Sequence, residues 1–129
     1  MAISVHHITR YTVQVLTRRL GDNARSSISV RLYDDENVNR GVAVFESYQD
    51  GEEPPKPTGE YATQSATAYL DMAHFSAYMD VLRLENPVYL KIAWGQQGRT
   101  RVVSQVSIDT KKEVIGDFFV KPAGKRGKS

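Results

Sequence analysis

The sequence contains no cysteine among its 129 residues. This absence excludes a disulfide framework and a cysteine nucleophile. The chain also lacks an apolar run approaching the roughly 20 residues that a transmembrane helix needs. Its first seven residues have neither the basic nor the apolar region of a secretory signal. We therefore expect a cytoplasmic protein with no membrane partner.

The overall composition is that of a globular protein. Apolar residues make up 40% and charged residues 25% of the chain, which argues against disorder and against a fibrous protein. The length fits one domain, and a chain of this size buries enough surface to fold without a metal or other cofactor. We expect no cofactor.

The positive charge is concentrated at the C-terminus. Residues 1–120 carry 13 basic and 15 acidic groups, a net charge of −2, whereas residues 121–129 carry four basic groups and no acidic group. The last nine residues have too few apolar side chains to fold alone. The sequence thus predicts a globular domain at 1–120 and a basic, flexible tail at 121–129, which serves solubility or contacts an anionic partner.

Most of the chain alternates between apolar and polar residues with the period of two that is typical of half-buried strands. Strands are expected at 10–16 (beginning as early as Ile3), 27–33, 42–45, 61–70, 88–94, 102–108 and 113–120. The run Gly95–Gly98 predicts a hairpin turn between two of these strands. The segment 49–59, with three Pro and two Gly, predicts an exposed loop.

One helix is expected at about 72–85. Asp71 can cap its first turn, and Met72, Phe75, Met79 and Leu82 recur at helical spacing. Pro87 disfavours helical backbone at Asn86 and thus predicts the end of the helix.

The predicted fold class is α+β. Because the connections between strands are short, we expect a mostly antiparallel sheet of six to seven strands with the helix packed on one face. The order of four strands followed by a helix resembles the repeat unit of whirly-like single-stranded nucleic-acid binders. This resemblance concerns the layout alone, since no motif residue accompanies it.

The sequence offers no convergent set of catalytic residues. His6 and His7 are adjacent on an expected strand and should point to opposite faces, and His74 stands alone at the start of the helix. A small-molecule carrier or an enzyme would need a pocket between helix and sheet, for which Tyr69, His74 and Tyr78 are the candidate lining residues. We favour a protein that is not an enzyme, and we predict no catalytic residue.

A weak metal-site pattern lies between two expected strands. Asp35, Asn37, Asn39 and Glu46 have the spacing of oxygen ligands in a calcium loop. Such a loop requires glycine at its sixth position, where this chain has Arg40. A plain hairpin turn accounts for the same residues, and we expect no metal there.

Two binding hypotheses remain. The first is a protein-interaction or assembly module that forms a homodimer or contacts another protein through exposed sheet edges. The second is single-stranded nucleic-acid binding, in which bases stack on tyrosines and phosphates pair with basic side chains. Its candidate residues are Arg31, Tyr33, Tyr89, Lys91, Arg99, Arg101, Lys125, Arg126 and Lys128. We favour the assembly module.

Overall fold

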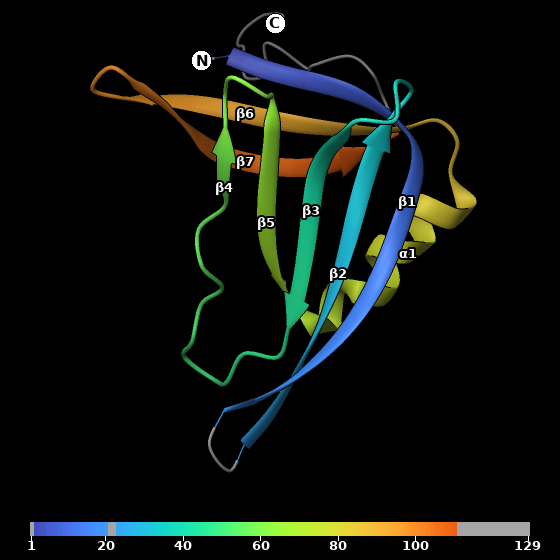
Figure 1. The fold of residues 1–129 in the computed structure, drawn as a ribbon, viewed down its shortest axis with the longest axis vertical. Coiled ribbons are helices and arrows are strands. Elements are labelled where there is room, and N and C mark those ends of the chain that lie inside the picture. Colours follow the sequence, from blue (N-terminus) through green and yellow to red (C-terminus); the bar gives the residue numbers. More distant parts are fainter. Residues whose placement is uncertain (1, 21–22, 111–129) are drawn as a thin grey trace, which may run out of the picture.

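The computed structural model describes residues 2–20 and 23–110, in which one seven-stranded sheet curves around a helix-covered core (Figure 1). The elements in chain order are β1 (Ala2–Leu20), β2 (Asn23–Asp34), β3 (Asn39–Glu46), β4 (Thr58–Glu60), β5 (Ser65–Asp71), the 3₁₀ turn η1 (Met72–His74), α1 (Phe75–Leu84), β6 (Val88–Gln97) and β7 (Thr100–Asp109). The predicted α+β class and the single principal helix are confirmed.

The strands follow the order β4-β5-β3-β2-β1-β6-β7 and nearly close into a barrel. All neighbouring pairs are antiparallel except β3 and β5, which run parallel. At the closure, a Cβ built on Gly59 of β4 would lie 2.5 Å from Cγ2 of Val103 of β7. The backbone of β4 at Gly59 therefore lies close to the Val103 side chain of β7, which brings the two ends of the sheet together.

A β-bulge in β1 reverses which of its residues face the core. Before the bulge, Ser4 and Ile8 are buried in register with β6, and after it the pairing with β2 shifts between Ile8 and Arg10. A bulge inserts one extra residue, so that odd-numbered positions such as Tyr11 then face inward. The bulge thus lets β1 keep apolar side chains toward the core both where it pairs with β6 and where it pairs with β2.

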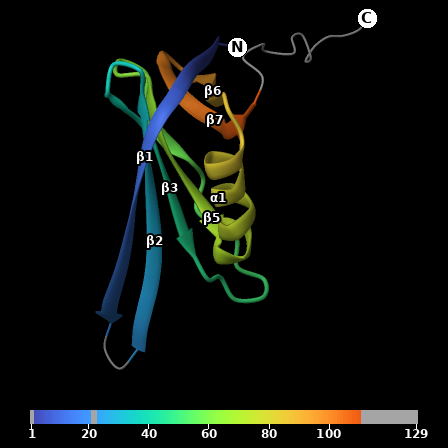
Figure 2. The same cartoon turned by 90° about the vertical axis from the view of Figure 1, so that its right-hand side faces the viewer.

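The core consists of inward-facing side chains from β2, β3 and β6, with Phe45, Leu32, Leu90 and Trp94 almost completely buried. Helix α1 lies across this side of the sheet (Figure 2). Phe45 meets the rings of Phe75 and Tyr78 edge to face, with centroids 5.3 and 5.2 Å away. These aromatic contacts anchor the helix to the sheet.

The predicted helix begins and ends close to the expected residues. The Asp71 carboxylate accepts a hydrogen bond of 2.9 Å from the Ala73 amide and caps η1. Helix α1 ends at Leu84, three residues before Pro87. Asp71 therefore caps the start of the helical segment, and the helix ends shortly before Pro87, as the sequence predicts.

Two predicted segments were wrong in detail. The expected strand at 61–70 begins only at Ser65, because residues 61–64 form a turn in which Gln64 adopts a φ of +53°. The hairpin turn expected at Gly95–Gly98 lies instead at Gly98 and Arg99, since β6 continues to Gln97 and Gly98 supplies a φ of +62°. The expected strand at 113–120 and the tail at 121–129 lie outside the described residues.

Candidate assembly surface

A two-stranded ribbon extends from the lower end of the body (Figures 1 and 2). We define the arm as residues 10–20 of β1 together with residues 23–31 of β2. On one side, β1 pairs with β2 along the whole arm. On its other side, β1 pairs with β6 only from Ala2 to Ile8, so within the described residues its edge has no partner strand beyond that point.

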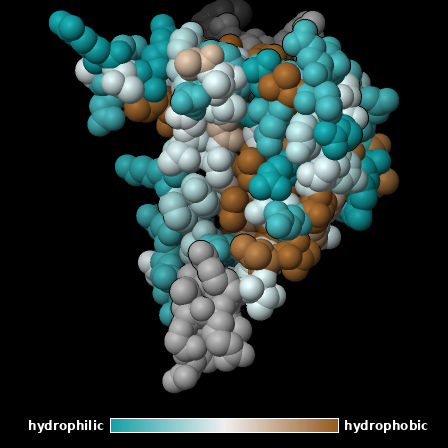
Figure 3. All heavy atoms as spheres, in the orientation of Figure 1, coloured by the Kyte–Doolittle hydropathy of each residue, from teal (hydrophilic) through white to brown (hydrophobic). Residues whose placement is uncertain are grey.

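The exposed edge carries apolar side chains on both faces. Val13 and Val15 are 44% and 66% exposed although they point to the same side of the ribbon as the buried Val30. Leu16, on the opposite face, is also exposed. An unpaired strand edge with exposed apolar side chains is a template for pairing with another chain. Figure 3 shows further apolar atoms gathered near the base of the arm on an otherwise largely hydrophilic face.

The charge of the chain is divided between the arm and the segment that follows it. In the sequence, residues 10–31 contain five arginines and one aspartate, a net charge of +4. Residues 34–85 contain eleven acidic and three basic groups, a net charge of −8. The near-neutral total of the chain thus conceals a basic stretch of sequence that is followed by an acidic one.

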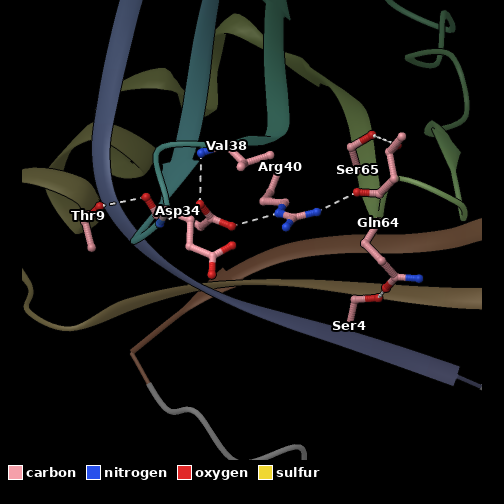
Figure 4. A network of polar contacts seen from close by, with 9 residues as sticks. Ser4, Thr9, Asp34, Val38, Arg40, Gln64 and Ser65 are labelled. Atoms are coloured by element: carbon pink, nitrogen blue, oxygen red, sulfur yellow. Dashed lines mark hydrogen bonds and ion pairs between the residues drawn. The ribbon is translucent and has the colours of Figure 1, made fainter.

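A buried polar cluster closes one end of the barrel (Figure 4). The Asp34 carboxylate accepts hydrogen bonds from the amides of Glu36 and Val38 and from Nε of Arg40, at 2.8–3.0 Å. Nη1 of Arg40 donates to the carbonyl of Thr63 at 2.6 Å. The cluster therefore ties the turn after β2 to the turn before β5.

The electrostatics of Asp34 result from two opposing effects. Burial alone would raise the pKa of its carboxyl, but the hydrogen bonds from Arg40, Val38 and Glu36 outweigh it and hold the pKa below the ordinary value. The side chain is only 8% exposed, so the ion pair with Arg40 is largely shielded from solvent. The three hydrogen bonds that the Asp34 carboxylate accepts all come from groups of the β2–β3 turn and β3, so its role is structural.

His6 lies beside this cluster on the inward face of β1. Its Nε2 atom is buried and has no hydrogen-bond partner among the described residues. Burial, together with the nearby Arg40 guanidinium, lowers the pKa of His6, while Asp34 and the backbone of Gln64 act in the opposite direction. Burial and Arg40 thus favour the neutral form of the imidazole.

The candidate nucleic-acid residues do not form one free face. Arg31 is exposed on the arm, where Nη1 donates to Gln14, and the Tyr33 ring is covered by the Arg10 guanidinium at 3.9 Å. Tyr89 and Lys91 lie on the outward face of β6, Tyr89 against the His7 ring and Lys91 paired with Asp109 at 3.0 Å. The rings that would stack on bases and the basic groups that would pair with phosphates are therefore already in contact with other side chains of the protein.

The remaining basic candidates are placed elsewhere. Arg101 stacks on Tyr61 at 4.7 Å, and Tyr61 in turn meets the buried Trp94, so that Arg101 lies on the opposite side of the sheet from Lys91. Arg99 is exposed in the β6–β7 turn. Lys125, Arg126 and Lys128 lie outside the described residues.

The structure does not bring together the candidate pocket residues. His74 is exposed at the end of η1, whereas Tyr78 packs on Phe45 and burial raises the pKa of its hydroxyl well above the ordinary value. Tyr69 is in register with Val44 on β3, and its position alternates with that of Leu70, which packs against the core. These three side chains line neither of the two concavities described below.

The calcium-type pattern folds as a turn. Asn37 adopts a φ of +63°, and its Oδ1 accepts two hydrogen bonds from Arg10. Asp35 is exposed, and Glu46 lies at the far end of β3. Across residues 2–20 and 23–110, no group of three acidic or histidine side chains is arranged to hold a metal ion. In the same residues, no helix is long and apolar enough to cross a bilayer.

Among the described residues, the concavities that are open to solvent include one beside β1 and one beside β4. One, of about 340 Å³, lies where β1 passes the C-terminal end of α1, and its lining includes His7, Arg10 and Glu85. The other is a shallow groove of about 480 Å³ beside β4, lined by Asn39, Val42, Thr58, Gly59, Glu60, Ser65, Ala66 and Thr67. We call the second one the β4 groove.

No family model, curated protein or solved structure matches the chain. Its function must therefore be argued from its own residues. Sequence reasoning missed the arm edge at Val13, Val15 and Leu16, and also the cluster around Asp34. The available signal for the arm was its charge, because residues 10–20 contain three arginines and no acidic residue.

Proposed function

We propose that this protein is a non-catalytic assembly module that associates with further copies of itself through the arm. The observation that carries the proposal is the edge of β1 beyond Ile8, which has no partner strand among the described residues. Edge strands in monomeric proteins are normally short, carry inward-pointing charged residues or are covered by another element, because an open edge can pair with another chain. This edge is long, and Val13, Val15 and Leu16 expose apolar surface along it.

The other edges of the sheet favour the arm as the contact surface. Strand β4 has only three residues, and its Gly59 lies against Val103 of β7. The nearly closed barrel therefore leaves little of these two edges for pairing. A two-stranded ribbon is also marginally stable by itself, so contact with a neighbour would stabilise the arm.

Sedimentation velocity over a range of about 1 to 200 μM tests the proposal. We expect the wild type to sediment faster as its concentration rises. The double variant Val15→Glu/Leu16→Glu, which places a charge on each face of the arm edge, should remain monomeric. Leu84→Glu is the matched control, since Leu84 is 75% exposed at the end of α1. A wild type that stays monomeric throughout would overturn the proposal.

A further inference from the structure

The row that β6 occupies beside β1 is open where β6 begins. Val88, the first residue of β6, is in register with Ile8, so the described residues place no strand on that side of β1 from Thr9 onwards. The concavity of about 340 Å³ lies at this point, because its lining comes from β1 between His7 and Tyr11, from the end of α1 and from Val88. An extended segment in this position would continue the row of β6 along the arm.

Strand β7 ends beside the entrance to the open row. Asp109 is in register with Tyr89 of β6, and Tyr89 is in register with His7 of β1. Adjacent strands lie about 4.8 Å apart, so the end of β7 is one such step from the row of β6. Because β6 is antiparallel to both neighbours, β7 runs in the direction in which β1 continues into the arm. A chain that leaves β7 therefore heads along the free edge of β1.

The sequence after β7 matches the free edge in length and composition. Residues 113–120 are eight in number, as are residues 10–17 of β1, and five of the eight are β-branched or aromatic. Residues 110–112 separate β7 from this segment and span up to about 10 Å when extended, roughly twice the sideways step. The segment 113–120 itself lies outside the described residues.

We infer that residues 113–120 pair with the free edge of β1 in the same molecule as a parallel strand, and that they thereby compete with a second copy for the arm. This inference rests on the proposed self-association and names what regulates it. The short tether favours the same molecule, because it gives the segment an effective concentration on the order of 1 mM, above the protein concentrations at which copies meet. Covering an edge in this way is a recognised means of preventing pairing between chains.

Variants of the full chain test the inference by sedimentation velocity. Ile115→Asp/Phe118→Asp places one charge on each face of the inferred strand and should free the arm edge. Ala123→Asp/Gly124→Asp adds the same charge beyond the segment and is the matched control. We expect the dissociation constant for self-association to be about tenfold lower in the segment variant than in the control.

The other outcomes of this comparison are decisive as well. Equal dissociation constants in the two variants would overturn the inference and leave the proposed function intact. A higher dissociation constant in the segment variant would also overturn it, because the segment of one copy would then be pairing with the arm of another. If neither the wild type nor either variant self-associates, the proposed function itself is rejected.

Hydrogen exchange tests the inference independently of self-association. It is measured at about 1 μM protein, where the monomer prevails, on the amides of residues 10–17 that point away from β2. Pairing with the segment protects these amides, so they should exchange about tenfold faster in Ile115→Asp/Phe118→Asp than in Ala123→Asp/Gly124→Asp. Equal exchange rates in the two variants would show that the segment does not cover the edge.

Discussion

Nε1 of Trp94 donates a hydrogen bond of 2.8 Å to the hydroxyl of Ser4, which lies ninety positions earlier in the chain. The Ser4 hydroxyl in turn donates to Oε1 of Gln64. The indole is 1% exposed and belongs to the only tryptophan in the sequence. This bridge connects β6, β1 and the turn before β5, so the fluorescence of Trp94 reports on the closed end of the barrel.

Ser4→Ala should destabilise the protein. It leaves the buried indole N–H without its acceptor, which costs about 1–3 kcal/mol of unfolding free energy. Urea unfolding followed by Trp94 fluorescence measures the loss. Ser76→Ala, at an exposed position of α1, is the control and should change stability by no more than about 0.5 kcal/mol. Equal stability of the two variants would show that the bridge contributes nothing.

Gly59→Ala should weaken the closure between β4 and β7. The added Cβ would lie 2.5 Å from Cγ2 of Val103 and 2.7 Å from the backbone oxygen of Ser65. Overpacking of this kind costs about 1–3 kcal/mol, measured by thermal unfolding. Gly95→Ala is the matched control, because its nearest neighbours would be 3.9 Å away. Adding Val103→Ala should restore only part of the loss, since the contact with Ser65 is with the backbone.

The elements that local patterns define were predictable from the sequence. The alternation in Val88–Trp94 and the helical spacing of Met72, Phe75 and Met79 reflect the geometry of a strand and a helix directly. The turn at 61–64 was missed because its residues continue the alternation of β5, and nothing local indicates that Gln64 takes a positive φ. The parallel pairing of β3 with β5 depends on contacts far apart in the chain.

The candidate surface was harder to predict than the fold. Tyr11, Val13 and Val15 have the pattern of a buried strand face, and the sequence does not reveal that β6 stops pairing with β1 at Ile8. Exposure there depends on which strand lies beside β1, which is a property of the whole sheet. The ion pair of Asp34 with Arg40 likewise depends on the folded turn, and no pattern in the sequence indicates it.

Asp34→Asn should be among the more damaging single substitutions. It breaks a largely buried ion pair and leaves the Arg40 guanidinium without its charged partner, for a loss of about 3–5 kcal/mol at pH 7. Because the folded pKa of Asp34 lies below its ordinary value of 3.8, its stabilisation is present above that pH and declines as the pH falls below it. Urea unfolding at pH 7 and at pH 3 should therefore show a smaller gap between wild type and variant at the lower pH.

Asp35→Asn provides the comparison for Asp34. Asp35 is the next residue and is exposed, so its substitution should change stability by no more than about 0.5 kcal/mol. If the two variants were equally stable at pH 7, the cluster around Asp34 would not be holding the two turns together.

His6 should make the closed end of the barrel sensitive to mild acid. Its folded pKa lies below the ordinary value of 6.5, so the unfolded chain binds the proton more readily and stability falls as the pH drops below 6.5. The charged groups beside the imidazole are Arg40, which opposes protonation, and Asp34, which favours it. Urea unfolding between about pH 7.5 and pH 5 should show this loss in the wild type and a flatter profile in His6→Gln. An unchanged profile in His6→Gln would assign the acid sensitivity to another group.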